Sequence, residues 1–378
     1  MHIAFLTPEY PDATTGKSGG LGTSISNIAQ ALFNKGITVS VIIPYQDKSE
    51  VINRDGIQIF KIAQKKYPIA NWYFYKKAVA EIINQFIAAY KIDIIEAPDW
   101  TGISAFMNLN CPITVRLNGS DAYFCHIDNR PQKKKNFYLE KLNLQNATGL
   151  LSASSYTAQI TKKVFNMNRE FTTIHNAIDA QSFLPQGQEL ENQILYFGTI
   201  IRKKGVLDLA VAFNKLIELR PESQLIFLGK DTTDYKTQSS TVVLVTSMLT
   251  EKASKQTTFI EEVPYHEVKE YLSKATVICL PSYAEAYPMT WLEAMSMEKA
   301  LVTSDIGWAQ EMMVHGETGF MVHPSKHADM TVYLKRMLDD KVLRTQMGKN
   351  ARKRVKEHFS TDVIVEQNIF YYKELLGL

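Results

Sequence analysis

Two glutamates stand at a spacing that suits sugar binding, in the segment LPSYAEAYPMTWLEAMSM at residues 280–297. Pro288 suits the first turn of a helix. Glu285 is therefore expected in the preceding loop, and Glu293 about one and a half turns into the helix. Carboxylates at these places could accept hydrogen bonds from ribose and sugar hydroxyls. The alternative is a surface acid followed by a solvated helix residue, and the spacing alone does not decide between the two.

The start of the same helix could bind an anion. Met289 and Thr290 fall in its first turn, where backbone N–H groups have no intrahelical acceptor and the helix dipole favours negative charge. An anion site flanked by two carboxylates would suit a nucleotide-sugar, because the amides could hold the phosphate and the acids could hold the hydroxyls.

A glycine-rich loop, KSGGLGTS at residues 17–24, precedes a second predicted helix. Gly19 and Gly20 would let a ligand approach the backbone closely, and Lys17 adds a full positive charge. We interpret the loop as a phosphate site. It lacks the Gly-Lys-Ser/Thr ending of a P-loop and the spacing of the dinucleotide fingerprint. The alternative is a flexible loop that merely precedes a helix.

Cations gather in a third loop, FGTIIRKKG at residues 197–205, which also leads from a predicted strand to a helix. Arg202, Lys203 and Lys204 could neutralise a pyrophosphate there. The alternative is a solvated basic turn. A fourth loop, RLNGSDAYF at residues 116–124, offers Asn118 to sugar hydroxyls, although from spacing alone an Asx turn that ends a strand is the better interpretation.

Apolar periodicity alternates between strands and helices along the chain, which favours parallel sheets covered by helices on both faces. Helical stripes occupy residues 25–33, 79–90 and 206–219, and the first is expected to have Thr23 or Ser24 as its N-cap. The expected strands are residues 2–7, 37–43, 92–96, 113–117, 149–153, 171–174, 193–197, 224–228, 241–245, 276–280 and 300–303.

These elements predict an α/β protein with two doubly wound, Rossmann-like domains that face a central cleft. The N-terminal, acceptor-binding domain is expected at residues 1–180 and the C-terminal, nucleotide-sugar-binding domain at residues 181–360. A polar stretch without periodicity at residues 180–192 predicts the linker. A last helix at residues 361–378 is expected to pack back on the N-terminal domain.

Composition narrows the class of protein further. The 378 residues carry 42 basic and 39 acidic side chains, a net charge of +3, which is too balanced for a protein that wraps nucleic acid. No apolar run approaches the length of a membrane span. The N-terminal segment lacks a basic n-region, so it does not resemble a signal peptide. Three scattered cysteines fit a reducing compartment. We therefore expect a cytoplasmic protein.

Basic and aromatic residues gather in the first half of the chain, in RPQKKKNFY at residues 130–138 and in the pairs Lys65–Lys66 and Lys76–Lys77. They could face an anionic glycan, or a lipid-linked acceptor at the inner face of a membrane, where the protein would be peripheral. A solvated basic face is an equally good interpretation.

Several of these motifs resemble those of retaining GT-B glycosyltransferases in glycosyltransferase family 4 (glycosyl transferases group 1). The similarity includes PSYAEAYPMTWLEAM, ALVTSDIGWAQEMM and GETGFMVHP between Glu261 and Pro324, and IHNAID at residues 174–179. KSGGL resembles the phosphate loop of the related glycogen and starch synthases. The family includes many polysaccharide-biosynthesis enzymes, and the resemblance covers nearly the whole chain.

The resemblance implies roles for individual residues. Glu285 would lie near the hydroxyls of the transferred sugar, and Glu293 would bind the ribose. Arg202 and Lys204 would bind the donor pyrophosphate. Gly19 and Gly20 would lie near the phosphates, and Val263 would meet the base through its backbone.

Two positions depart from the family pattern. Thr199 stands where many relatives carry Arg, so that Arg202 is the candidate substitute. Asn118 stands where many carry His; it can bond a sugar hydroxyl but cannot take up a proton.

We therefore expect transfer of a sugar, with retention, from a UDP- or GDP-linked donor to a hydroxyl of a glycan or lipid-linked acceptor. No Asp-x-Asp element stands out, so that protein cations would replace a metal, and no cofactor is expected beyond the donor. A donor phosphate oxygen would accept the acceptor's proton. The alternatives are a nucleotide-sugar epimerase of the same fold and a non-catalytic carbohydrate-binding module.

Overall fold

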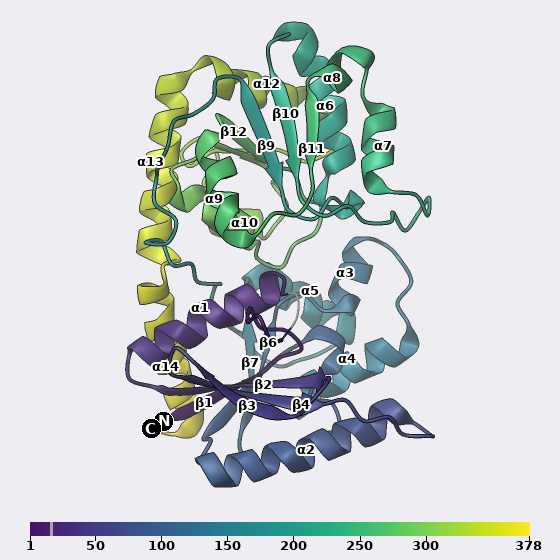
Figure 1. Ribbon diagram of the computed structural model, residues 1–378, viewed down its shortest axis with the longest axis vertical. Coiled ribbons are helices and arrows are strands. Elements are labelled where there is room, and N and C mark those ends of the chain that lie inside the picture. The colour runs from purple at the N-terminus through teal and green to yellow at the C-terminus, as the bar shows by residue number, and fades with distance from the viewer. Residues whose placement is uncertain (16–17) are drawn as a thin grey trace. The chain divides into compact units, whose positions relative to one another are not determined.

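The computed structural model describes residues 1–15 and 18–378, which form two compact units (Figure 1). Unit 1 comprises Met1–Ile178 and Phe359–Leu378, and unit 2 comprises Asp179–His358. The chain therefore passes between the units twice.

Residues 180–192, the expected linker, lie inside unit 2. The buried guanidinium of Arg352 donates hydrogen bonds to the carbonyls of Phe183 and Ala180, at 2.8 and 3.3 Å. The amide of Leu190 donates to the carbonyl of Lys274 at 2.8 Å. A polar, aperiodic sequence is thus anchored to the unit by backbone and side-chain hydrogen bonds.

Unit 1 is built on an eight-stranded sheet in the order β3-β4-β2-β1-β5-β6-β7-β8. All neighbours are parallel except β3 and β4, an antiparallel edge hairpin that the alternating pattern did not indicate. The strands are β1 His2–Leu6, β2 Thr38–Gln46, β3 Glu50–Arg54, β4 Ile57–Ala63, β5 Ile94–Pro98, β6 Ile113–Leu117, β7 Gly149–Ser152 and β8 Thr172–Thr173.

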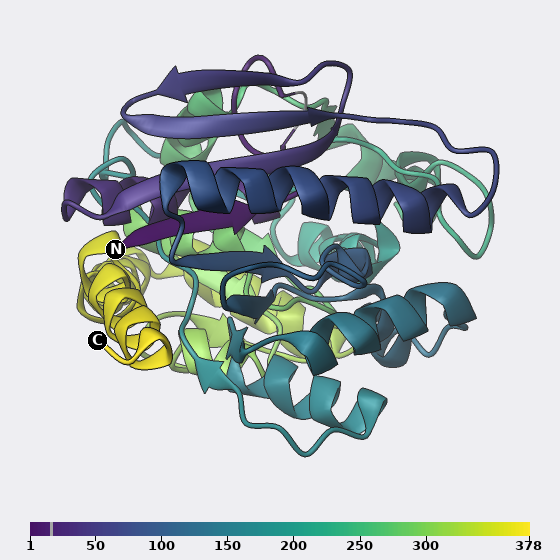
Figure 2. The same cartoon turned by 90° about the horizontal axis from the view of Figure 1, so that it is seen from below.

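Helices cover both faces of this sheet because alternate strand residues point to opposite sides. On one face Ile3 and Phe5 of β1 pack with α1 (Gly20–Asn34) and α14 (Thr361–Leu376). On the other, Ala4 and Leu6 pack with α2 (Asn71–Tyr90), which Figure 2 shows in front of the sheet. Helices α3 (Asp121–Ile127), α4 (Lys134–Asn146) and α5 (Ser155–Phe165) pack around β6 and β7.

The C-terminal helix α14 belongs to the core of unit 1. The hydroxyl of Tyr372 donates to Glu96 at 2.6 Å, and Glu96 pairs with Arg116 at 2.7 Å. Arg116 also donates to Asn368 of α14 at 2.5 Å. This buried network pairs both charges and joins the last helix to β5 and β6, as a buried ion pair requires.

Unit 2 contains a six-stranded parallel sheet in the order β11-β10-β9-β12-β13-β14. Its strands are β9 Gln193–Phe197, β10 Gln224–Leu228, β11 Thr257–Ile260, β12 Val277–Leu280, β13 Leu301–Thr303 and β14 Phe320–Met321. Its helices are α6 Val206–Leu219, α7 Thr241–Met248, α8 Glu251–Lys255, α9 Tyr265–Lys274, α10 Met289–Ser296, α11 Ala309–Met312, α12 His327–Asp339 and α13 Lys341–His358.

Two local expectations are wrong. Residues 241–245, expected as a strand, begin α7, because the side chain of Ser240 caps the amide of Val243 and starts a helix despite the β-branched run. The first helix begins at Gly20 rather than after Thr23 or Ser24, and its N-cap, Gly19, offers no side chain.

Candidate functional site

The second sheet places its candidate site where the strand order reverses. After β9 the chain leads to β10 on one side, and β12 lies on the other side of β9. Loops at the carboxyl ends of two such strands form the usual ligand site of an open parallel sheet. The loop after β9 carries Arg202 and Lys204 in the short helix η2 (Arg202–Lys204), and the loop after β12 carries Glu285.

Lys204 and Glu285 meet at this switch point. The ammonium nitrogen of Lys204 contacts Oε1 of Glu285, which also accepts a hydrogen bond of 2.9 Å from the hydroxyl of Ser282. Glu285 is buried, and Lys204 is partly exposed. Two side chains that the sequence placed on separate loops therefore form one charged cluster.

Gly205 allows the two loops to approach. Its φ is +71°, and a Cβ on it would lie only 1.9 Å from the carbonyl oxygen of Pro281. The amide of Tyr283 donates to the carbonyl of Lys203 at 2.8 Å, which joins the same loops a second time. A residue with a side chain at position 205 would push Lys204 away from Glu285.

Arg202 makes a different contact. Its guanidinium forms a bidentate pair with Asp234, with bonds of 2.7 and 2.9 Å. This pairing holds the pKa of Asp234 well below its usual range. The charge of Arg202 is therefore already balanced within unit 2, by an acid that the sequence did not indicate.

Helix α10 starts beside this cluster. Its N-cap, Pro288, makes no side-chain hydrogen bond to the first turn, where Met289 and Thr290 lie. A Cβ on Gly198, directly after β9, would lie 3.9 Å from the methyl carbon of Thr290. The first turn of α10 thus faces the loop that follows β9, with amides that have no acceptor inside the helix.

Glu293 lies on the buried side of the same helix and is 4% exposed. Its Oε1 accepts a hydrogen bond of 2.7 Å from the hydroxyl of Tyr265, the first residue of α9. Burial raises the pKa of Glu293 to about 7. Val263 lies half-buried in the loop between β11 and α9. Glu293 of α10 contacts the first residue of α9, so both residues expected to bind base and ribose lie near the start of α9.

The glycine-rich loop of unit 1 already contacts a carboxylate. Oε1 of Glu9 accepts hydrogen bonds from the amides of Gly19 and Gly22, at 3.0 and 2.8 Å. Glu9 thus caps the start of α1, next to Gly20, where a phosphate was expected. Lys17 lies outside the described residues.

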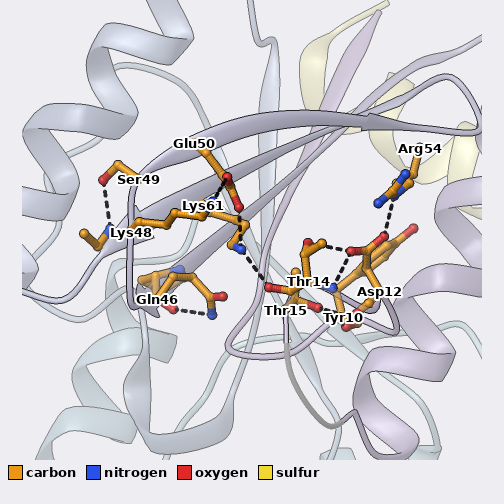
Figure 3. A network of polar contacts seen from close by, with 12 residues as sticks. Tyr10, Asp12, Thr14, Thr15, Gln46, Lys48, Ser49, Glu50, Arg54 and Lys61 are labelled. Carbon is orange, nitrogen blue, oxygen red and sulfur yellow. Dashed lines mark hydrogen bonds and ion pairs between the residues drawn. The ribbon is translucent and has the colours of Figure 1, made fainter.

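Side chains from the edge hairpin hold the segment before that loop (Figure 3). Lys61 of β4 donates to the carbonyl of Thr14 at 2.7 Å and pairs with Glu50 of β3 at 2.7 Å. Arg54 at the end of β3 pairs with Asp12 at 2.9 Å. The antiparallel hairpin therefore positions residues 10–15.

Asn118 follows β6 and has a buried neighbour that the sequence did not single out. Its backbone amide donates to Oδ1 of Asp99 at 2.9 Å. The other oxygen, Oδ2, is buried and has no hydrogen-bond partner among the described residues. Burial raises the pKa of Asp99 to about 7. Asp99 follows β5, so these two polar residues lie side by side at the carboxyl edge of the first sheet.

Sequence reasoning missed most of the partners in these contacts. Ser282 stood in a recognised motif, and Asp99 in the segment EAPDW directly after a predicted strand, so both positions carried a signal. No such signal marked the remaining three, each of which meets its partner only through contacts within its own unit: Glu9, Asp234 and Tyr265.

Across residues 1–15 and 18–378, no group of three or more His, Cys, Asp or Glu side chains is arranged to hold a metal ion. None of the helices in this described part of the chain has the length and apolarity that a bilayer span needs.

Comparison with known protein families matches both units. A family described as Glycosyltransferase Family 4 matches residues 18–182, and one described as Glycosyl transferases group 1 matches residues 179–354. Uncharacterized glycosyltransferase MJ1607 of Methanocaldococcus jannaschii is 24% identical over 401 aligned positions, which cover 100% of both chains.

Solved structures show the same fold. Sucrose-phosphate synthase from Thermosynechococcus elongatus matches with a TM-score of 0.80 and 19% identity, over 100% of this chain and 99% of that one. HepE from Anabaena, solved in complex with UDP-glucose, matches with a TM-score of 0.72 and 16% identity, over 99% and 100% of the two chains.

Proposed function

Because the chain belongs to the GT-B glycosyltransferases of family 4 and group 1, we propose that it transfers a hexose from a UDP-linked donor to a saccharide hydroxyl, with retention at the anomeric carbon. The UDP-glucose complex of HepE supports this donor over a GDP-linked one. The proposal includes a role in polysaccharide synthesis. None of the relatives named above is an epimerase or a binding module.

The observation that carries the proposal is the cluster of Lys204, Glu285 and Ser282 at the switch point of the second sheet. It combines a cation for a pyrophosphate with a carboxylate for sugar hydroxyls, beside the uncapped first turn of α10. Departure of a nucleoside diphosphate builds negative charge on the pyrophosphate, and preformed positive groups stabilise that charge.

The ion pair suggests how donor binding proceeds. In the free protein Glu285 and Lys204 neutralise each other. A bound pyrophosphate would compete for the Lys204 ammonium and leave the Glu285 carboxylate able to accept hydrogen bonds from the sugar. Ser282 would keep Glu285 in place during this exchange.

Two other elements complete the proposed donor site. Glu293, held by Tyr265, would bind the ribose hydroxyls as its ionised form, and the backbone near Val263 would meet the base. Asn118 would bond a hydroxyl of the sugar or the acceptor. We propose that a donor phosphate oxygen, rather than a protein base, takes up the acceptor's proton.

The test is a transfer assay with UDP-glucose, GDP-mannose and a set of oligosaccharide acceptors. We expect release of UDP only when an acceptor is present, and a product whose anomeric configuration, read by NMR, matches that of the donor. An altered but intact donor would indicate an epimerase, and binding without either reaction would indicate a carbohydrate-binding module. Full activity after treatment with EDTA would support the proposal that protein cations replace a metal.

The acceptor and the location are finer proposals. A lipid-linked saccharide at the inner face of a membrane is one acceptor that the basic segments of unit 1 would suit. Comparing free and lipid-linked acceptors in the same assay would test it. The cytoplasmic location stays a prediction.

A further inference from the structure

An open pocket of about 320 Å³ lies in unit 1, where the start of α2 meets α4. Its volume is in the range of small-ligand sites. Its lining, which we call the aromatic–lysine pocket, consists of Trp72, Phe106, Lys135, Tyr138, Leu139, Lys141, Leu142 and Gln145. None of these residues belongs to the candidate donor site.

The pocket combines apolar walls with positive charge. The ammonium nitrogen of Lys135 lies 4.6 Å from the centre of the Trp72 ring, a cation–π contact. Trp72 is 37% exposed and Tyr138 is 67% exposed. Large aromatic side chains with a polar edge, next to lysines, are typical of the boundary between lipid and water.

The surrounding chain adds cations but no acids. Residues 64–80 and 129–139 contain no Asp or Glu. The nearest acid along α4, Glu140, is buried and accepts hydrogen bonds from the amides of Asp121 and Ala122, so its charge does not face the pocket. Arg130 pairs with Asp121 and Asp128 and contributes little net charge.

Lys76, near the pocket, is a buried lysine whose pKa is affected by the charge of Lys135. Lys76 of α2 donates hydrogen bonds to the carbonyls of Gly102 and Ile103, at 2.5 and 2.7 Å. It is buried, so the expectation that Lys76 faces solvent is wrong. Burial, and then the charge of Lys135, lower its pKa to about 7. The carbonyls bind the Lys76 ammonium internally, which leaves Lys135 and Lys141 as the outward cations of the pocket.

We propose that the aromatic–lysine pocket docks unit 1 on an anionic lipid surface. Lys135 and Lys141 bind the lipid phosphates, and Trp72 and Tyr138 lie at the level of the headgroups. Charge complementarity favours this occupant, because each lysine near an anionic bilayer adds attraction. Ile69, two residues before α2, is 78% exposed and adds an apolar contact at the same end of the helix. A neutral glycan would need paired acceptors and donors rather than a one-sided set of cations.

The test is co-sedimentation of the 378-residue chain with vesicles of phosphatidylcholine alone or mixed with phosphatidylglycerol. We expect binding only to the mixed vesicles, and at least tenfold weaker partitioning of the double variant K135E/K141E. The matched control is K349E/K353E, the same charge change at exposed lysines of α13 in unit 2. Equal partitioning of the two double variants, or indifference to phosphatidylglycerol, would overturn the proposal.

Tryptophan fluorescence locates the contact. Trp72 and Trp100 are 37% and 44% exposed, whereas Trp291 and Trp308 are fully buried. We expect mixed vesicles to shift the emission to shorter wavelength in the wild type and in W100F, but not in W72F. A shift that persists in W72F would show that the lipid binds elsewhere. A response of Trp72 to an anionic oligosaccharide but not to vesicles would make the pocket a glycan subsite and overturn lipid docking.

This inference goes beyond the proposed transfer and does not depend on it. UDP release with a free oligosaccharide acceptor, measured without vesicles, is expected to be retained in K135E/K141E. Vesicle binding without any transfer would contradict the proposed function alone, and transfer without vesicle binding would contradict lipid docking alone.

Discussion

Lys204 contacts the carboxylate of Glu285 although 81 positions separate them in the chain. The contact joins the loops after β9 and β12, two neighbouring strands on either side of the switch point. The contact brings together the cation proposed to bind the pyrophosphate and the acid proposed to bind the sugar, so a change at either residue should affect transfer.

Replacing Lys204 by alanine is expected to lower kcat about 10²–10³-fold, the usual cost of removing one group that stabilises developing negative charge. UDP release under saturating UDP-glucose measures it. The matched control is K215A, which removes an exposed lysine of α6 in the same unit. A K204A variant that keeps wild-type kcat would remove Lys204 from the site.

The effects of losing Lys204 and Glu285 should not add. If the two groups act as one unit, K204A/E285A should lose much less activity than the product of the two single losses. A double-mutant cycle on kcat/KM measures the coupling. Independent, multiplicative losses would show that the ion pair has no part in catalysis.

Gly205 should tolerate no side chain. Its φ is +71°, and a Cβ at this position would lie 1.9 Å from the Pro281 carbonyl oxygen, so G205A must displace backbone. We expect a loss of about 2 kcal/mol or more in the free energy of unfolding, together with reduced kcat, because the shift moves Lys204.

Gly36 provides the control for this substitution. It has a φ of +78°, but a Cβ added there would meet nothing within 4 Å. G36A should therefore cost only the left-handed strain, about 1 kcal/mol, without changing kcat. Urea denaturation separates the cases, and equal losses in the two variants would show that crowding at Pro281 has no effect.

Glu293 should make stability depend on pH. Its pKa is raised from 4.5 in the unfolded chain to about 7 in the fold, so the folded state binds more protons between these values. The contribution of Glu293 to stability is therefore greatest below pH 4.5 and falls as the pH rises to about 7.

The variant E293Q removes this ionisation. Relative to the wild type, its free energy of unfolding should rise between pH 4.5 and 7, by up to about 3 kcal/mol, and then stay level. The control is E374Q, at an exposed position of α14. A difference between E293Q and wild type that does not change with pH would show that folding does not raise the pKa of Glu293.

The periodic pattern predicted most strands of both sheets because their apolar runs are buried on both sides, as at Ile113–Leu117 and Gln193–Phe197. It failed where one local contact decided the outcome. Ser240 turns a valine-rich run into α7, and Thr257–Ile260, half polar and short, becomes β11 only by pairing with β10.

The candidate site also contains positions that the sequence predicted and contacts that it did not. The positions of three residues could be predicted, because they follow strands or lie on a helix whose start is marked by Pro288: Glu285, Lys204 and Glu293. The pairing of Arg202 with Asp234 and the capping of Gly19 by Glu9 depend on how loops fold over one another, which spacing does not encode.

The two passages of the chain between the units have a consequence for biosynthesis. Tyr372 and its neighbours complete the core of unit 1, yet they leave the ribosome only after the whole of unit 2. All of unit 2 is synthesised before α14. Unit 2 can therefore finish folding while unit 1 still lacks its last helix. A nascent chain halted before Phe359 would expose the apolar face that α14 covers, and it should need a chaperone until α14 has been synthesised.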